Sequence, residues 1–159
     1  MEGNGLEMSF MKDKIKRTNV IEGKVFFDSN ILVYYVDQTD LRKQEIARKL
    51  IKEAISNGNG VLSTQCLQEF YNVVTKKLLC DKENAKKLVK MFADNFPITQ
   101  ISVPVILSAV DISIKTQFSF WDSLILSAAK DTGCIIVFSE DLTHGQLVEG
   151  SRIINPFAA

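Results

Sequence analysis

Short apolar runs alternate with longer segments of helical spacing along most of the chain. Residues 24–28 form an apolar, aromatic run that ends in an acid, and residues 134–138 form a second apolar run; both are typical of buried strands. Residues 61–62, 98–102 and 152–154 predict three shorter strands. Strands separated by helical segments indicate an α/β fold, in which helices cover both faces of a mostly parallel sheet.

The segments between these runs have the periodicity and the end signals of helices. Helices are predicted to begin at residue 30, at 39 or 40, after a cap at 63 or 64, at 81, at 104 and near 121. The Asn-Gly segment 57–60 should end the second helix, and Gly133 should end the last. The last helix carries Trp121 on its apolar stripe, so we expect this side chain in the core.

The start of the chain differs from the rest. Residues 1–23 mix charges, Gly and Asn with isolated apolar residues, a pattern of neither a signal peptide nor an amphipathic helix, and we expect a mobile leader. Residues 24–157 contain no Pro/Gly/Ser-rich linker and no repeat. A length of 159 residues with 46% hydrophobic content suits one core, so we expect a single domain over 24–157.

The absence of long apolar stretches and the small number of Cys and His residues bear on the compartment and on the type of metal. No apolar stretch approaches the roughly 20 residues needed to cross a bilayer, so we expect no membrane association. Cys66, Cys80 and Cys134 fit no zinc spacing, and His144 is the only histidine. We therefore expect reduced thiols in the cytoplasm, and any bound metal should have oxygen ligands.

The charges are segregated along a chain of zero net charge. Residues 42–90 carry eleven Lys and Arg against five Asp and Glu, or +6. Residues 1–41 carry five against seven, or −2, and residues 91–159 carry three against seven, or −4. This distribution suggests a footprint for a polyanion beside a separate acidic site, and ordinary solvated helix faces would give the same pattern.

Four acids stand in apolar surroundings: Asp28, Glu69, Asp122 and Asp141. Each alone is more often a helix cap or a turn former. Burial of an ionised carboxylate costs several kcal/mol, so such acids are expected to be paired, protonated or bound to metal, and basic residues are scarce near them in sequence. Mg²⁺ or Mn²⁺ suits all-carboxylate ligation, and a site of this kind can hydrolyse a phosphodiester without a protein nucleophile.

Five segments then resemble the motifs of PIN domains, particularly those of VapC-type toxins. They are FFDSNILVY (26–34), QEFYNV (68–73), FSFWDSLIL (118–126), FSEDLTHGQ (138–146) and IINPF (153–157). The resemblance implies a Rossmann-like, three-layer PIN fold and an endoribonuclease that uses Mg²⁺ or Mn²⁺. It also implies a small antitoxin protein as partner, RNA as substrate and a homodimer.

The resemblance assigns Asp28, Glu69, Asp122 and Asp141 as catalytic, metal-binding residues, with Asn30 and Ser139 as supporting residues. Ser139 stands at the Ser/Thr position of a Ser/Thr-x-Asp motif, which makes Asp141 the expected ligand; Glu140 is expected to be a solvated neighbour. Asn30 and Ser139 have a purely structural alternative, because both types are common after strands. His144 lies either near the substrate or in a plain surface turn. Phe118, Phe120 and Trp121 could stack on bases, although Trp121 fits the apolar stripe of its helix better.

Three other functions stay open. The chain could be a PIN-like RNA-binding protein without activity, or a PIN nuclease of RNA processing with no toxin role. A phosphatase of the haloacid-dehalogenase kind would need an Asp-x-Asp after the first strand, and the residue two beyond Asp28 is Asn30.

Overall fold

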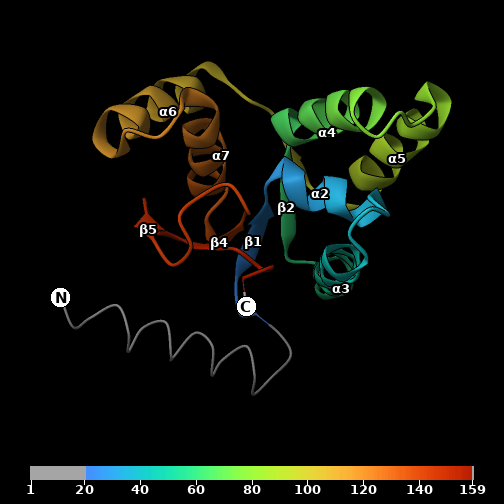
Figure 1. Ribbon diagram of the computed structural model, residues 1–159. Helices are drawn as coiled ribbons and strands as arrows, with labels where there is room; N and C mark the ends of the chain where they lie inside the picture. Colours follow the sequence, from blue (N-terminus) through green and yellow to red (C-terminus); the bar gives the residue numbers. More distant parts are fainter. Residues whose placement is uncertain (1–20, 159) are drawn as a thin grey trace.

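The computed structural model describes residues 21–158 as a six-stranded sheet flanked by helices (Figure 1). The predicted leader lies mostly outside the described residues. The strands are β1 (Lys24–Phe27), β2 (Gly60–Ser63), β3 (Ile98–Thr99), β4 (Cys134–Phe138), β5 (Leu147–Val148) and β6 (Ser151–Ile154), and their order is β3-β2-β1-β4-β6-β5. All neighbours pair in parallel except β5 and β6, which confirms the predicted mostly parallel sheet.

Within residues 21–158, six helices connect and cover the strands. They are α2 (Ser29–Val36), α3 (Leu41–Asn57), α4 (Thr64–Lys76), α5 (Lys82–Asn95), α6 (Val103–Thr116) and α7 (Phe120–Asp131). Figure 1 shows α6 and α7 together on one side of the central strands and α2 to α5 on the other. Within residues 21–158 no single helix is long and apolar enough to span a membrane; α6 and α7 reach that composition only together, across a bend of 118°.

The central strands are apolar because helices cover both of their faces. Phe26 and Phe27 of β1 are fully buried, although successive side chains on a strand point to opposite faces. Phe27 stacks on Phe138 of β4 with ring centroids 5.4 Å apart and meets Phe96 edge-on at 5.9 Å. These aromatic contacts fix the register of β1 against its neighbour, and that register sets the position of the residues that follow both strands.

The helices begin where the sequence places polar caps. Asp40 accepts a hydrogen bond from the Lys43 backbone, Ser63 from Cys66 and Asp81 from Asn84, so these predicted caps are confirmed. Gly58 ends α3 with a φ of 65°, a left-handed conformation that glycine adopts without a steric penalty. Ser63 is also the last residue of β2, so α4 starts directly after that strand.

Three expectations about the fold differ from the structure. The strand predicted over 98–102 covers only Ile98–Thr99, because Ser102 already caps α6. The antiparallel strand β5 was not predicted, since two residues carry too little periodicity to be recognised. The prediction that Trp121 lies in the core was wrong, because its side chain is 63% exposed. The residue lies in the first turn of α7, and its ring is 5.2 Å from that of Phe120.

The strand order creates a crevice at the carboxyl end of the sheet. From β1 the chain passes through α2 and α3 to β2 on one side, whereas β4 pairs on the other side of β1. This reversal is a topological switch point, where open α/β sheets bind their ligands. The residues after β1 and β4 meet there, since Phe27 pairs with Phe138 and the Asp28 amide donates to the Phe138 carbonyl at 2.9 Å.

Candidate active site

Asp28 lies at the switch point, directly after β1. It is buried, with 4% of its surface exposed, and it caps α2 by accepting a hydrogen bond from the Ser29 amide at 2.7 Å. Its other carboxylate oxygen accepts from the Ser139 hydroxyl at 2.7 Å. The parallel register of β1 and β4 brings these two residues side by side although 111 positions separate them.

Glu69 joins this site from α4. The Ser29 hydroxyl donates to Glu69 Oε2 at 2.6 Å and lies 3.4 Å from Asp28 Oδ1, so one serine bridges the two acids. The Gln65 amide, one turn earlier on α4, donates to Glu69 Oε1 at 2.8 Å. Both oxygens of the Glu69 carboxylate are therefore held in place by hydrogen bonds.

Asp141 joins from the loop after β4. The Asn30 amide donates to Asp141 Oδ2 at 3.0 Å and reaches Asp28 Oδ2 at 3.4 Å. The Asp141 backbone N–H donates to the Ser139 hydroxyl oxygen at 3.2 Å. Asn30 and Ser139 thus each contact both Asp28 and Asp141, which is the position expected of supporting residues.

Asp122 approaches from the first turn of α7. Its backbone N–H donates to the Ser119 cap at 3.1 Å. Its side chain is close enough to Asp141 and Glu69 for their charges to act on it, although no hydrogen bond links it to them. The structure therefore brings all four predicted acids to one end of the sheet, three of them in a hydrogen-bonded network and Asp122 beside it.

The acids are held in an environment that disfavours their charge. Burial raises the pKa of Asp28 to about 7, against a lowering by its hydrogen bonds from Ser139 and Ser29, and the charges of Glu69 and Asp141 raise it further. Burial also raises the pKa of Asp122, and Asp141 and Glu69 add to that shift. Uncompensated negative charge of this kind is what a bound cation would relieve.

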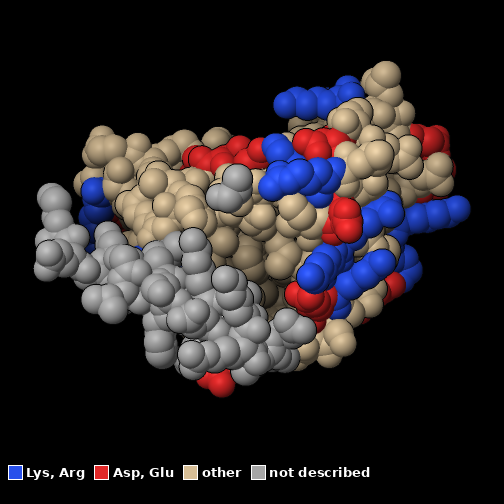
Figure 2. Space-filling view, turned by 60° about the horizontal axis from the view of Figure 1, so that its bottom comes forward, with Lys and Arg blue, Asp and Glu red and all other residues tan. Residues whose placement is uncertain are grey.

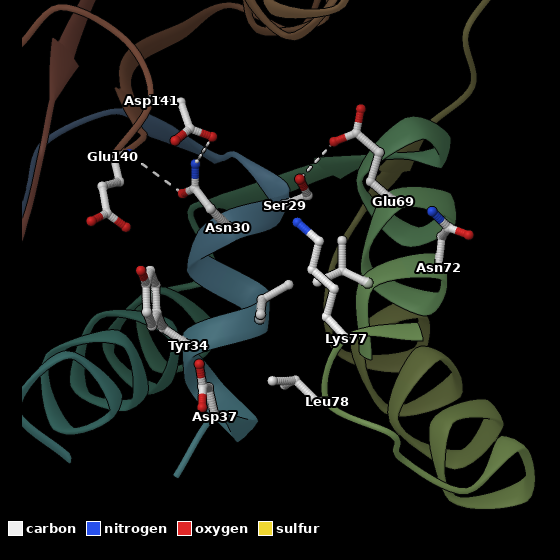
Figure 3. Close-up of a pocket in the computed structure, with 12 residues that line it drawn as sticks. Ser29, Asn30, Tyr34, Asp37, Glu69, Asn72, Lys77, Leu78, Glu140 and Asp141 are labelled. Atoms are coloured by element: carbon white, nitrogen blue, oxygen red, sulfur yellow. Dashed lines mark hydrogen bonds between the residues drawn. The ribbon is translucent and has the colours of Figure 1, made fainter. Parts of the chain in front are cut away.

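Glu69 and Asp141 line a pocket of about 430 Å³ between α2 and α4, whereas Asp28 and Asp122 do not line it. Figure 3 shows Glu69, Asp141 and Asn30 at one end and Asp37 and Leu78 at the other. Ser29, Tyr34, Asn72, Lys77 and Glu140 line its sides. The pocket extends well beyond the acids, so it can hold a ligand larger than a metal ion with its water.

Glu140 differs from the expectation of a solvated neighbour. It forms an ion pair with Lys43 of α3, and the two side chains are only 26% and 23% exposed. Lys43 also donates to the Tyr34 hydroxyl at 3.2 Å and lies 5.5 Å from the centre of the Phe157 ring. This cluster turns Glu140 away from the acids, while the next residue, Asp141, faces Asn30.

Two residues near the acids were not singled out from the sequence. Gln65 is 4% exposed and links Glu69 to the carbonyl of Trp121, at 3.1 Å, so it ties α4 to the turn that carries Asp122. Its spacing of four residues before Glu69 was a local signal for this contact. Ser29 was also missed, and its position between Asp28 and Asn30 was the only sequence signal for it.

His144 acts in a turn rather than at the acids. Its Nδ1 accepts a hydrogen bond from the Asn155 backbone at 2.9 Å, which ties the loop before β5 to the segment after β6. His144 does not line the pocket at the acids. Of the two alternatives for His144, its observed hydrogen bond fits the one in which it lies in a surface turn.

The acids fit a hard divalent cation by their chemistry. The oxygens that meet there belong to carboxylates and to the Ser29 and Ser139 hydroxyls, and Mg²⁺ and Mn²⁺ prefer such ligands. Asn30 faces the acids with its amide nitrogen, while its oxygen accepts a hydrogen bond from the Glu140 backbone. As the side chains stand, no group of three or more Asp, Glu, His or Cys residues within 21–158 has the arrangement of a metal site. Ser29 and Asn30 lie between the carboxylates and occupy the oxygens that a cation would share.

The basic segment 42–90 is not a uniformly positive surface. On α3, Arg48, Lys49 and Lys52 lie around the same shallow hollow as Glu45 and Glu53. Figure 2 shows this mixture, with Lys and Arg gathered on one half of the face and acidic side chains among them. The polyanion footprint that the charge segregation suggests thus stays a prediction.

The comparisons with known proteins identify the family. The model of the PIN domain matches residues 25–147, most of the chain, so the chain belongs to the PIN-domain family. No curated protein matches it.

Several solved structures share the fold. VapC20 of Mycobacterium tuberculosis, described as a toxin that cleaves the sarcin-ricin loop, is 14% identical, with a TM-score of 0.62 over 79% of this chain and 98% of that one. A DNA-bound VapBC from Salmonella typhimurium is 18% identical, with a TM-score of 0.63 over 82% and 96%. A toxin–antitoxin complex from Klebsiella pneumoniae is 15% identical, with a TM-score of 0.62 over 86% and 100%. At this identity the likeness shows the PIN-like fold, as predicted.

Proposed function

We propose that this chain is an endoribonuclease that uses Mg²⁺ or Mn²⁺ and serves as the toxin of a toxin–antitoxin pair. The observation that carries the proposal is the network in which Ser29, Asn30 and Ser139 join Asp28 to Glu69 and Asp141. Asp122 lies beside it, and a pocket opens from it. Membership in the PIN family and the fold of VapC toxins support the same reading.

Asp28, Asp122 and Asp141 would hold the cation, with Glu69 assisting. When bound, such a cation activates water and stabilises negative charge on a phosphodiester. The other roles fall to side chains of the protein. Ser29 and Gln65 hold the two oxygens of the Glu69 carboxylate, and the pocket admits the RNA backbone. Supporting residues of this kind keep carboxylates oriented when charge changes at the site.

The ion pair of Lys43 and Glu140 has a role in this arrangement. Glu140 is adjacent to Asp141, and a free carboxylate there would compete for the cation. Because Lys43 holds Glu140 beside the Tyr34 hydroxyl, only Asp141 of the two acids accepts a hydrogen bond from the Asn30 side chain. The ion pair thus lets α3 orient the loop that follows β4.

The proposed partners are RNA, an antitoxin protein and a second copy of the chain. Structures of toxin–antitoxin complexes share the fold, which supports an antitoxin. The second copy is supported by the outer face of α6, where a stripe of aliphatic side chains is exposed: Val103, Ile106, Leu107, Val110 and Ile114. The stripe carries no charge and can pack on itself about a twofold axis.

The cysteines bear on the compartment. Free Cys66, Cys80 and Cys134 suit the reducing cytoplasm.

RNA binding without cleavage is the second candidate. The carboxylates of residues 21–158 do not form a ready metal arrangement, which favours it. A titration with Mn²⁺ separates the two, because a catalytic site should bind the ion and be stabilised by it. A PIN nuclease of RNA processing would bind Mn²⁺ as well, and it would differ in leaving cell growth unimpaired when expressed without a partner.

The decisive experiment maps RNA ends. Total RNA is incubated with the wild-type protein, with Asp122→Asn and with Asp111→Asn, whose exposed carboxylate on α6 is a matched control. We expect new ends with Mn²⁺ for the wild type and the control and none for Asp122→Asn. Unchanged ends with Asp122→Asn would refute the assignment.

A further inference from the structure

Lys77 is fixed at the end of α4 by backbone hydrogen bonds. Its own N–H donates to the Val73 carbonyl at 2.8 Å, and the Cys80 N–H donates to the Val74 carbonyl at 2.9 Å. Between them Leu79 adopts a φ of 53°, a left-handed conformation that is costly for a bulky residue. The turn is therefore well determined, and it sets the direction in which the Lys77 side chain leaves the helix.

Lys77 supplies the positive charge of the acidic pocket. Of the 12 lining residues, four are acids, namely Asp37, Glu69, Glu140 and Asp141, and Lys77 is the only base. Figure 3 shows its amine pointing toward Ser29 and Glu69, at the end where the acids gather. In the described part of the chain Lys77 forms no ion pair, whereas Lys43, on the other side, is paired with Glu140.

The rest of the pocket suits a nucleoside. Val33, Val73 and Leu78 form its apolar floor. Asn72 also lines it, and Figure 3 shows this amide on the other side of α4 from Lys77. An apolar floor can carry a base or a ribose, and an amide can reach the polar edge of a base. A metal ion and its water need none of these groups.

We propose that Lys77 is a positioning residue that binds the RNA phosphate next to the one cleaved, and so places the adjoining nucleoside on the floor of the pocket. The inference rests on the proposed function and extends it to a subsite. A lysine there attracts a phosphate, because the scissile phosphate lies at the acids and its neighbour along the strand falls within the same pocket.

Two simpler roles are separable from this one. Lysine at the end of a helix favours the helix dipole, and Lys76, exposed at the adjacent position of α4, would contribute this equally. Lys77 could also merely balance the negative charge of the acids. Lys76 does not line the pocket, so Lys76→Met is a matched control for the first role, and the affinity for Mn²⁺ reports on the second.

The test measures binding of a short single-stranded RNA to the full chain at several salt concentrations, with Ca²⁺ in place of Mg²⁺ and with intact RNA verified on a gel. Loss of one phosphate contact should lower the slope of log K against log salt by about 0.7. We expect this for Lys77→Met, an unchanged slope for Lys76→Met and a wild-type slope for Lys77→Arg. In cleavage with Mn²⁺, Lys77→Met should raise KM more than it lowers kcat.

Other results overturn the proposal. Equal slopes for Lys77→Met and Lys76→Met would exclude a phosphate contact, while cleavage by the wild type would leave the proposed function standing. Tighter Mn²⁺ binding by Lys77→Met with an unchanged slope would show that Lys77 only balances the acids. A wild-type protein that neither binds nor cleaves RNA would end both proposals together.

Discussion

Replacing Asp28 with Asn should remove activity and yet stabilise the protein at alkaline pH. The carboxyl group is buried, and burial raises its pKa to about 7 from 3.8. Between these two pH values the folded protein binds more protons than the unfolded chain, so its free energy of unfolding falls as pH rises. Asn carries no charge to desolvate, and it can still cap α2 as Asp28 does.

The size of the effect follows from the linkage of pKa to stability. At about 1.4 kcal/mol for each pKa unit, the shift of Asp28 from 3.8 to about 7 corresponds to a loss of roughly 4 kcal/mol once pH exceeds both values. Part of this loss is already present at pH 5. The stability of Asp28→Asn relative to the wild type should therefore increase by roughly 2 to 3 kcal/mol between about pH 5 and pH 8. Rearranged hydrogen bonds of Ser139 and Asn30 add an offset that does not depend on pH.

The assay is urea unfolding of both proteins in the presence of a chelator at the two pH values. Asp111→Asn, at an exposed position of α6, controls for the loss of one negative charge. Added Mn²⁺ should stabilise the wild type by about 2.7 kcal/mol at a hundred times its dissociation constant, and the same concentration should stabilise Asp28→Asn by no more than about 1.4 kcal/mol. A stability difference that stays constant from pH 5 to pH 8 would show that Asp28 is not held in the raised-pKa state on which this reasoning depends.

Further predictions concern the supporting contacts. Ser29→Ala removes the hydrogen bond to Glu69, 2.6 Å long, and should lower cleavage roughly 10- to 100-fold with little change in melting temperature; unaltered cleavage would contradict the bridge. Lys43→Met leaves Glu140 half-buried without its partner and should cost about 1 kcal/mol in urea unfolding. Glu140→Gln in the same chain should recover part of that loss, and additive losses would exclude the pair. Leu107→Glu on the α6 stripe should yield a monomer in light scattering, and an unchanged mass would place any dimer elsewhere.

The sequence predicts best those features that are set locally. Asp28 follows an apolar run, and a strand that ends in an acid already points to the carboxyl edge of a sheet. The caps Asp40, Ser63 and Asp81 could be predicted because a cap bonds to an amide within the next turn. The choice of Asp141 over Glu140 came from the family resemblance, and the contact with Asn30 is in accord with it.

The rest depends on contacts between distant segments. Lys43 and Glu140 are 97 positions apart, and no local pattern indicates that α3 meets the loop after β4. Trp121 satisfies the helical periodicity of α7, but periodicity alone does not show where the neighbouring elements end. Its side chain is 63% exposed, although Ser123 in the same turn is buried. Lys77 is one of many lysines in the sequence, and only the pocket distinguishes it.

The central claim is that acids from four separate segments share a cation, and binding of Mn²⁺ tests it most directly. Titration calorimetry would compare the wild type with Asp28→Asn, Asp122→Asn and the exposed control Asp111→Asn. We predict saturable binding by the wild type and by Asp111→Asn, and binding weakened at least about tenfold in the other two. Wild-type affinity in both Asp28→Asn and Asp122→Asn would contradict the account.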